Sequence, residues 1–249
     1  MPQSPTRPPF IFLAAPCYGG MVNLHFMRSV LALETACAER GVGLHVELLP
    51  GDALITRARS RLAAQFLAHP DATHILYCDV DIGFSPQEAF RLLDADKPVI
   101  AAVCPLKHID WEKARAAALA GVADLQSSAL GYVVRFLPTP DNSIEVDDGV
   151  AKVAYGGTGF LMISRRAMQD VVDAHPELTA VVDDAGTRAV MVFDTLIEPE
   201  TGQHLSEDYA FCRRWRELGG EIFANVEARM IHAGHMAYTG SLISAMRRA

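Results

Sequence analysis

The chain has 249 residues, half of them hydrophobic, and a formal net charge of −8 at pH 7. This length and apolar content suit one large α/β domain with ample core, and the acidic balance without a basic run argues against a nucleic-acid partner. The five cysteines form no C-x-x-C pair, which argues against a zinc site and a disulfide framework.

Strands and helices alternate in the first half of the sequence. Strands are predicted at 10–15, 44–49, 74–78 and 98–104, and helices at about 22–39, after Asp52 as an N-cap, and from about Pro86. This alternation predicts a mainly parallel sheet with helices on both faces. In such a sheet the binding loops lie at the carboxyl ends of the strands.

The second half is less regular. Strands are predicted at 130–136, 160–164 and on both sides of the turn at 184–186, and a helix from Ser206 to Leu218. The sequence shows no internal repeat and no low-complexity linker. We therefore expect a single domain over 1–249, with a nucleotide-binding half at 10–105 and an acceptor or catalytic half at 106–240.

The sequence contains no apolar run long enough for a membrane span, and the prolines of MPQSPTRPPF argue against a signal peptide. A cytoplasmic protein without a transmembrane segment is therefore expected. The C-terminal SLISAMRRA is predicted as a terminal helix, with peripheral contact at the inner membrane surface as the alternative.

Two aspartates, Asp79 and Asp81, follow the apolar run HILYC one residue apart. Because side chains alternate along a strand, both carboxylates point to the same side, where they form a candidate site for a divalent cation. About one Asp-x-Asp pair is expected by chance in this length, and Asp94 and Asp96 form such a pair at a predicted helix end. A pair of ordinary turn aspartates is the alternative for Asp79 and Asp81.

Basic residues lie on the helix predicted before this strand. Arg57 and Arg61 are four residues apart and share a face, with Arg59 between them. Like charges at this spacing are mildly destabilising, and an anion such as a diphosphate would relieve the repulsion. A solvated basic face is the alternative.

Three later segments contain further chemical groups. Glu207 and Asp208 follow Ser206 in the first turn of a predicted helix, where acids stabilise the helix end; alternatively, one of them is a general base. His232 ends an apolar run and is either a third metal ligand or a core histidine. The glycine-rich segment 155–160 lacks the phosphate-loop lysine and the dinucleotide spacing, so we expect its backbone to approach a sugar closely.

Taken in order, these segments resemble a glycosyltransferase of the GT-A fold. The matching segments, between about residues 10 and 240, are FIFLAAPCYGG, TRARSRLAAQFL, ATHILYCDVDIGF, VCPLKHIDW, GGTGFLMISRRAM, SEDYAFCRRWRELGGEIF and IHAGHMAYTG. Their order is similar to bacterial and viral members of the broad family-2-like group, related to the collagen hydroxylysine glycosyltransferases. The resemblance implies a Rossmann-like, mainly parallel sheet and a mixed acceptor-side half.

The resemblance also implies roles for individual residues. Asp79 and Asp81 match the D-x-D motif and, with His232, imply a Mn²⁺ or Mg²⁺ site. Asp208, beside Glu207, matches the acid that supplies the catalytic base in inverting members. The donor-binding residues that the resemblance implies are Pro16, Cys17, Tyr18, Arg57, Asp79, Lys107, Gly157, Thr158 and Gly159.

The reaction implied is metal-dependent transfer of a hexosyl group from a nucleoside-diphosphate sugar, a UDP-sugar by the habit of the family, with inversion at the anomeric carbon. The acceptor is a hydroxyl of a glycan, a lipid-linked molecule or a protein. One alternative is a nucleotidyltransferase that makes a nucleotide-sugar, although the first loop lacks the expected basic residue. The other is an inactive glycan-binding domain, although such domains commonly lose acids that this sequence keeps.

Overall fold

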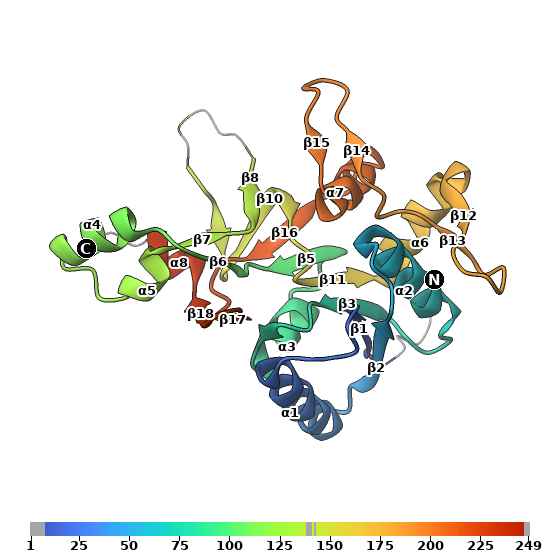
Figure 1. Cartoon of the computed structure of the whole chain (residues 1–249), viewed down its shortest axis with the longest axis horizontal. Coiled ribbons are helices and arrows are strands. Elements are labelled where there is room, and N and C mark those ends of the chain that lie inside the picture. Colours follow the sequence, from blue (N-terminus) through green and yellow to red (C-terminus); the bar gives the residue numbers. More distant parts are fainter. Residues whose placement is uncertain (1–7, 138–140, 142, 247–249) are drawn as a thin grey trace, which may run out of the picture.

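The computed structural model describes residues 8–137, 141 and 143–246, and a nine-stranded sheet runs through its centre (Figure 1). The strand order is β2-β1-β3-β11-β5-β16-β10-β8, with β9 paired to β10. The strands are β1 (Phe10–Cys17), β2 (Gly43–Pro50), β3 (His74–Cys78), β5 (Val99–Ala102), β8 (Val134–Phe136), β9 (Val146–Asp147), β10 (Val150–Gly156), β11 (Phe160–Ser164) and β16 (Ile222–Asn225). The four strands predicted in the first half are confirmed by β1, β2, β3 and β5.

The central sheet is mixed. β1 pairs in parallel with β2 and β3, and β5 pairs in parallel with β16. In contrast, β11 is antiparallel to both β3 and β5, and β10 is antiparallel to its neighbours. β11 suits a central position because residues 160–163 are apolar and at most 1% exposed. The α/β class is confirmed. The strands β1, β2, β3, β5 and β16 run in one direction, as expected of a mainly parallel sheet, but β10 and β11 run against them, and β11 separates β3 from β5.

Helices cover both faces of the sheet, as the alternation predicted. α1 (Leu24–Arg40) and α3 (Pro86–Asp94) pack on one face, where Leu33 shares an apolar cluster with Leu13 of β1. α2 (Ile55–Ala68), α6 (Arg165–Ala174) and α7 (Glu207–Glu217) pack on the other, where Phe66 shares a cluster with Phe12. Adjacent residues of β1 thus enter opposite clusters, as the alternation of strand side chains requires.

The second half also forms an arm that projects from the sheet (Figure 1). We use "arm" for β6 (Pro105–Ile109), α4 (Trp111–Leu119), α5 (Leu125–Ser128), β7 (Leu130–Tyr132), β18 (Ala237–Gly240) and α8 (Leu242–Met246). β6 pairs with β7, and β18 pairs with β17 (Met230–Ala233), which also pairs with β4 (Ile82–Gly83). Because β4 directly follows Asp79 and Asp81, its pairing with β17 places the hairpin of β17 and β18 beside these two aspartates.

The remaining elements are small: the 3₁₀ turn Pro176–Leu178, β12 (Thr179–Val181), β13 (Arg188–Val190), β14 (Leu196–Ile197) and β15 (His204–Leu205). The strand predicted at 130–136 is interrupted at Val133, because β7 pairs with β6 whereas β8 pairs with β10. The helix predicted from Ser206 is α7. Within the described ranges, no helix is long and apolar enough to cross a membrane.

Two predictions about aspartates have different outcomes. The N-cap role of Asp52 is wrong, because α2 starts after Leu54 and the Asp52 carboxylate accepts a hydrogen bond from Leu54 N at 3.1 Å instead. The pair Asp94 and Asp96 does lie at a helix end: Asp94 is the last residue of α3 and pairs with Arg40, and Asp96 has a φ of 49°.

Candidate active site

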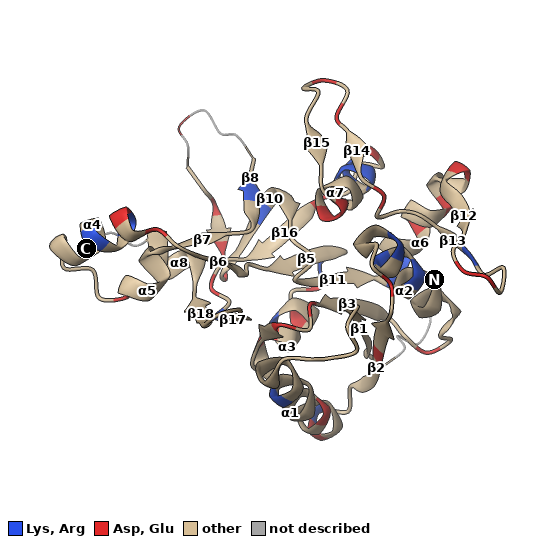
Figure 2. Ribbon diagram, viewed as in Figure 1, with Lys and Arg blue, Asp and Glu red and all other residues tan. Residues whose placement is uncertain are grey.

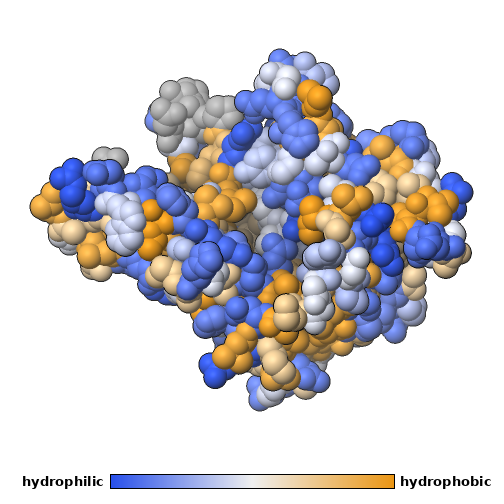
Figure 3. Space-filling view, in the orientation of Figure 1, coloured by the Kyte–Doolittle hydropathy of each residue, from blue (hydrophilic) through white to orange (hydrophobic). Residues whose placement is uncertain are grey.

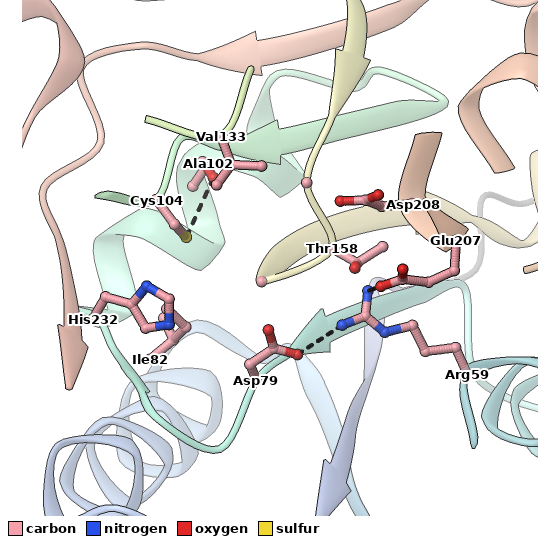
Figure 4. A pocket seen from close by; sticks show the side chains of 12 residues that line it. Arg59, Asp79, Ile82, Ala102, Cys104, Val133, Thr158, Glu207, Asp208 and His232 are labelled. Atoms are coloured by element: carbon pink, nitrogen blue, oxygen red, sulfur yellow. Dashed lines mark hydrogen bonds and ion pairs between the residues drawn. The ribbon is translucent and has the colours of Figure 1, made fainter. Parts of the chain in front are cut away.

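A cavity of about 130 Å³ opens at the carboxyl ends of β3 and β5, beside the start of α7 (Figure 4). Its lining residues are Arg59, Asp79, Ile82, Ala102, Cys104, Val133, Gly157, Thr158, Gly159, Glu207, Asp208 and His232. Most of the predicted site residues thus meet in one place, although the sequence separates the first acid, Asp79, widely from Asp208. The fold brings these residues together because β11 lies beside β3 in the sheet, and because α7 starts close to the carboxyl ends of the strands.

Arg59 joins two acidic segments of this cavity (Figure 4). Its Nη2 lies 2.9 Å from Asp79 Oδ1, and its Nη1 lies 3.2 Å from Glu207 Oε1. The residue is 4% exposed, and its Nε and Nη1 make no hydrogen bond of good geometry, so the pairing with Glu207 is an electrostatic contact. Buried donors without partners are costly, and these two give Arg59 unused capacity to bind an anion.

Arg57, which we predicted near the donor, does not line the cavity. Its guanidinium lies 2.8 Å from an oxygen of Asp52, and that of Arg61 lies 3.4 Å from the other oxygen. The Asp52 side chain is 1% exposed. This internal carboxylate supplies the negative charge that we had assigned to a bound diphosphate, and it explains how two like charges share one face of α2.

Arg59 was not predicted as a site residue, although a signal was present. It lies three, four and seven residues before Leu62, Ala63 and Phe66, so it belongs to the buried stripe of α2. An arginine on the apolar stripe of a helix needs a buried partner. Figure 2 shows the basic residues of α2 and the acidic start of α7. The ion pair between Arg59 and Glu207 connects these two helices.

The two aspartates of the motif lie in different electrostatic surroundings. The pKa of Asp79 is raised, mainly by desolvation. The charge of Arg59 opposes this increase in part, and the charge of Asp81 adds to it. Desolvation also acts on Asp81, but contacts with His232 and Lys107 outweigh it and hold the pKa of Asp81 below its ordinary value. Lys107, predicted to assist phosphate binding, donates a hydrogen bond to Asp81 Oδ2 beside the cavity.

His232 faces Asp81 in an arrangement that favours a cation. Its Nδ1 lies 2.8 Å from the Pro105 carbonyl oxygen, which can only accept, so Nδ1 carries the proton. Its Nε2 lies 3.4 Å from Asp81 Oδ1, a buried oxygen that accepts no hydrogen bond of good geometry. Two acceptor atoms that face each other need either a proton or a metal ion between them. A backbone carbonyl that orients the second ring nitrogen is also typical of metal-binding histidines.

The predicted metal set of Asp79, Asp81 and His232 is only partly assembled. Among the residues that the structure describes, no three His, Cys, Asp or Glu side chains converge to hold a metal, because Asp79 directs Oδ1 to Arg59. Asp81 and His232 alone offer one oxygen and one imidazole nitrogen. This donor pair fits Mn²⁺ or Mg²⁺, which usually bind few protein carboxylates together with substrate phosphates.

Asp208 and Glu207 have distinct environments at the start of α7. Glu207 pairs with Arg59, whereas Asp208 Oδ1 accepts hydrogen bonds from the Ser206 hydroxyl and from Tyr209 N. Ser206 occupies the N-cap position but its side chain does not cap the helix. Within the described part of the chain, both hydrogen bonds to Asp208 use Oδ1, which leaves Oδ2 available in the cavity to accept a proton.

The loop 157–159 forms the wall of the cavity between β10 and β11. A Cβ on Gly157 would lie 2.6 Å from Val133 Cγ1, and a Cβ on Gly159 would lie 3.6 Å from both Asp79 Oδ2 and Cys104 Sγ. Gly157 therefore has no space for a side chain, and Thr158 is 2% exposed. The glycines allow the backbone to approach the acids closely, and the close approach of this backbone to a sugar stays a prediction.

Pro16, Cys17 and Tyr18 lie at the end of β1 and just after it, outside the lining of the cavity. Cys17 is 3% exposed, whereas Tyr18 is 67% exposed. The Tyr18 carbonyl accepts a hydrogen bond from Gly51 N at 3.0 Å, which ties the loop after β1 to the loop after β2. Their part in donor binding stays a prediction.

The apolar wall of the cavity, formed by Ile82, Ala102, Cys104 and Val133, was not predicted as part of the site. Burial raises the pKa of the Cys104 thiol far above its ordinary value, and the charges of Asp79 and Asp81 add to this increase. The thiol is therefore protonated at neutral pH and is a poor nucleophile. The acids of the cavity, and not its cysteine, are left to carry chemistry.

No family model and no curated protein matches the chain. Among solved structures, it is similar to A197 from STIV, with 14% identity and a TM-score of 0.49, over 91% of this chain and 86% of that chain. It is also similar to a glycosyltransferase involved in the glycosylation of the major capsid of PBCV-1, with 12% identity and a TM-score of 0.32, over 68% of this chain and 67% of that chain. Both TM-scores are below 0.5, so neither similarity supports a function for this chain.

Proposed function

We propose that the protein transfers a sugar from a nucleoside-diphosphate sugar to an acceptor hydroxyl. The observation that carries this proposal is the convergence, in one cavity, of a carboxylate with a free oxygen on Asp208, a buried arginine, Arg59, and the close glycine loop 157–159. A proton acceptor, a binding group for anions and a backbone wall are the parts that direct displacement of a diphosphate requires. The resemblance of the sequence to GT-A glycosyltransferases supports the same reaction.

In the proposed reaction, Asp208 Oδ2 accepts the proton of the acceptor hydroxyl while the hydroxyl oxygen attacks the anomeric carbon. The bond between that carbon and the diphosphate oxygen breaks, and its electron pair leaves with the nucleoside diphosphate. Arg59 and Lys107 stabilise the negative charge that develops on this leaving group. Attack from the face opposite to the leaving group would invert the configuration.

Asp81 and His232 are the residues that would hold a Mn²⁺ or Mg²⁺ ion, and the bound ion would supply positive charge beside the diphosphate. Glu207 acts as a positioning residue, because it pairs with Arg59 and so fixes the guanidinium between the two acidic segments. A UDP-sugar is the donor that the sequence resemblance favours, and the acceptor hydroxyl belongs to a glycan, a lipid-linked molecule or a protein.

The test is to incubate the purified chain with Mn²⁺, a panel of nucleotide-sugars and mixed acceptors, and to measure free nucleoside diphosphate. We expect release from one donor class, and we expect Asp208→Asn to lower the rate by about 10²- to 10⁴-fold, the usual contribution of a general base. Asp184→Asn, at an exposed position, is the matched control and should leave the rate unchanged. An unchanged rate in Asp208→Asn would remove its role as base.

A parallel reaction with a sugar phosphate and a nucleoside triphosphate, in which pyrophosphate is measured, separates the two alternatives. A nucleotidyltransferase would consume a sugar phosphate and a nucleoside triphosphate and release pyrophosphate. An inactive glycan-binding domain would release nothing from any donor.

A further inference from the structure

A second cavity, of about 210 Å³, lies in the arm, and its walls are almost entirely apolar. Ala129 and Leu130 form its floor and are 6% and 4% exposed, while Trp111, Leu125 and Met236 lie at its rim and are 73%, 42% and 48% exposed. Exposed apolar side chains around a concave surface are typical of a binding site. Figure 3 shows hydrophobic side chains on the arm, and a hollow between the arm and the rest of the molecule.

The strand β6 connects this arm cavity to the candidate active site. Pro105 accepts the hydrogen bond that orients His232, and Lys107 pairs with Asp81. Ile109, at the end of the same strand, lines the arm cavity. Pro105, Lys107 and Ile109 thus lie along one strand of at most about 13 Å at 3.3 Å per residue, whose pairing with β7 is irregular between Pro105 and Ile109.

The hairpin of β17 and β18 makes a second connection. Tyr238 lines the arm cavity and pairs directly with His232 of the active-site cavity, so both side chains point to the same face. Lys107 and Tyr238 also flank Gly234, where a Cβ would lie 3.1 Å from Lys107 Cδ and 3.4 Å from Tyr238 Cε2. The side chains of Lys107 and Tyr238 thus both lie close to Gly234, and the cross-strand pair of His232 and Tyr238 contributes one residue to each cavity.

We propose that the arm cavity binds an apolar part of the acceptor, such as an alkyl chain or an aromatic ring attached to the molecule whose hydroxyl is glycosylated. This inference rests on the proposed glycosyl transfer and narrows the acceptor to an amphiphilic molecule. An acceptor whose hydroxyl lies beside Asp208 extends past Lys107 and Tyr238 into the arm. The polar head then faces the charged cavity, and the apolar group fills the arm cavity.

The chemistry of the lining favours this occupant. Among the described residues that line the cavity, the polar side-chain groups are those of Gln126 and Tyr238 and the indole N–H of Trp111. A sugar unit placed there would bury hydroxyl groups without enough partners, which costs free energy. An alkyl or aromatic group has no such cost, and the rim of Trp111, Leu125 and Met236 would lose exposed apolar surface on binding. The direct pairing of His232, in the active-site cavity, with Tyr238, in the arm cavity, favours an acceptor over a second copy of the chain.

The binding experiment uses alkyl glucosides as probes, below their micelle-forming concentrations. The chain has two tryptophans, Trp111 and Trp215, so a Trp215→Phe background leaves Trp111 as the reporter at the rim. We expect octyl glucoside to shift its fluorescence saturably, and each methylene added from butyl to octyl to tighten binding by about two- to fourfold. Methyl glucoside should cause no saturable shift.

Two variants test the location of the site. Leu125→Gln combined with Met236→Gln places amides at the rim and should weaken octyl glucoside binding by about tenfold. Leu119→Gln, on α4 at 81% exposure and outside the cavity, is the matched control and should bind normally. Affinity that does not depend on chain length, or that survives the rim variant, overturns the proposal.

An activity measurement separates this inference from the proposed function. With the productive donor, octyl glycosides of a panel of sugars should accelerate release of nucleoside diphosphate more than the methyl glycosides do, and the rim variant should remove that difference by raising KM. Equal rates with methyl and octyl acceptors overturn the acceptor site while the glycosyltransferase function stands. No release from any donor refutes the glycosyltransferase function, and with it the acceptor role of a cavity that still binds octyl glucoside.

Discussion

Replacing Arg59 by methionine removes the guanidinium that connects Asp79 and Glu207. The side chains of Arg59, Asp79 and Glu207 are 5%, 34% and 18% exposed. Removal of one partner from a buried ion pair costs about 3–5 kcal/mol, and Asp79 recovers part of its hydration because a third of its side chain is exposed. We therefore expect Arg59→Met to lower the free energy of unfolding by about 3 kcal/mol.

The assay is urea unfolding at pH 7, followed by circular dichroism. The triple variant Arg59→Met, Asp79→Asn and Glu207→Gln removes the uncompensated charges and should recover most of the loss, because the cost lies in the unpaired carboxylates. Arg91→Met is the matched surface control: its side chain is 54% exposed and lies 3.2 Å from Glu227, so the loss should stay below about 1 kcal/mol. If Arg59→Met loses no more than this control, the buried ion-pair network does not stabilise the site.

Three further predictions concern pH, packing and metal. Desolvation raises the pKa of Asp52, but hydrogen bonds from Arg57 and Leu54 N outweigh this effect and hold the pKa below its ordinary value. The ionised Asp52 therefore stabilises the fold at pH values above its pKa in the unfolded chain, which is about 4. The stability gap between wild type and Asp52→Asn should thus shrink as pH falls from 7 to 3 in unfolding experiments, and a constant gap would contradict this. Gly157→Ala would place a Cβ 2.6 Å from Val133 Cγ1 and should cost about 1–3 kcal/mol in unfolding experiments; adding Val133→Ala should restore most of it, and absence of rescue would contradict the contact. EDTA should abolish release of nucleoside diphosphate and Mn²⁺ should restore it; release that is insensitive to EDTA would exclude a metal at Asp81 and His232.

The fold of the first half could be predicted from the sequence because its signals are local. Apolar runs bounded by turns gave β1, β2, β3 and β5. The position of β11 could not be predicted, because the apolar run at 160–164 is compatible with any buried place in a sheet. Its insertion between β3 and β5 depends on long-range pairing, which a local pattern does not encode.

The candidate site shows the same division between local and long-range information. Asp79, Asp208, His232 and the glycine loop line one cavity. Asp79, Asp208 and the glycine loop lie at element ends that the sequence indicated, whereas His232 lies within β17. The choice between Arg57 and Arg59 depended on which face of α2 is buried. The sequence favoured Arg57 and Arg61 as the residues that bind an anion, whereas in the structure both guanidinium groups pair with the Asp52 carboxylate. The apolar residues Ile82, Ala102 and Val133 had no local signal, because they differ from core residues only in facing a cavity.

The most direct test of the central claim is a ³¹P NMR time course of the purified protein with Mg²⁺, which is diamagnetic, each nucleotide-sugar in turn, and an octyl glycoside acceptor. Glycosyl transfer predicts that the signals of one nucleotide-sugar decline while those of free nucleoside diphosphate grow, and that Asp208→Asn slows both. Donor signals that stay constant for every nucleotide-sugar, or pyrophosphate formed from a sugar phosphate and a nucleoside triphosphate in a parallel reaction, would contradict the assignment of this site to glycosyl transfer.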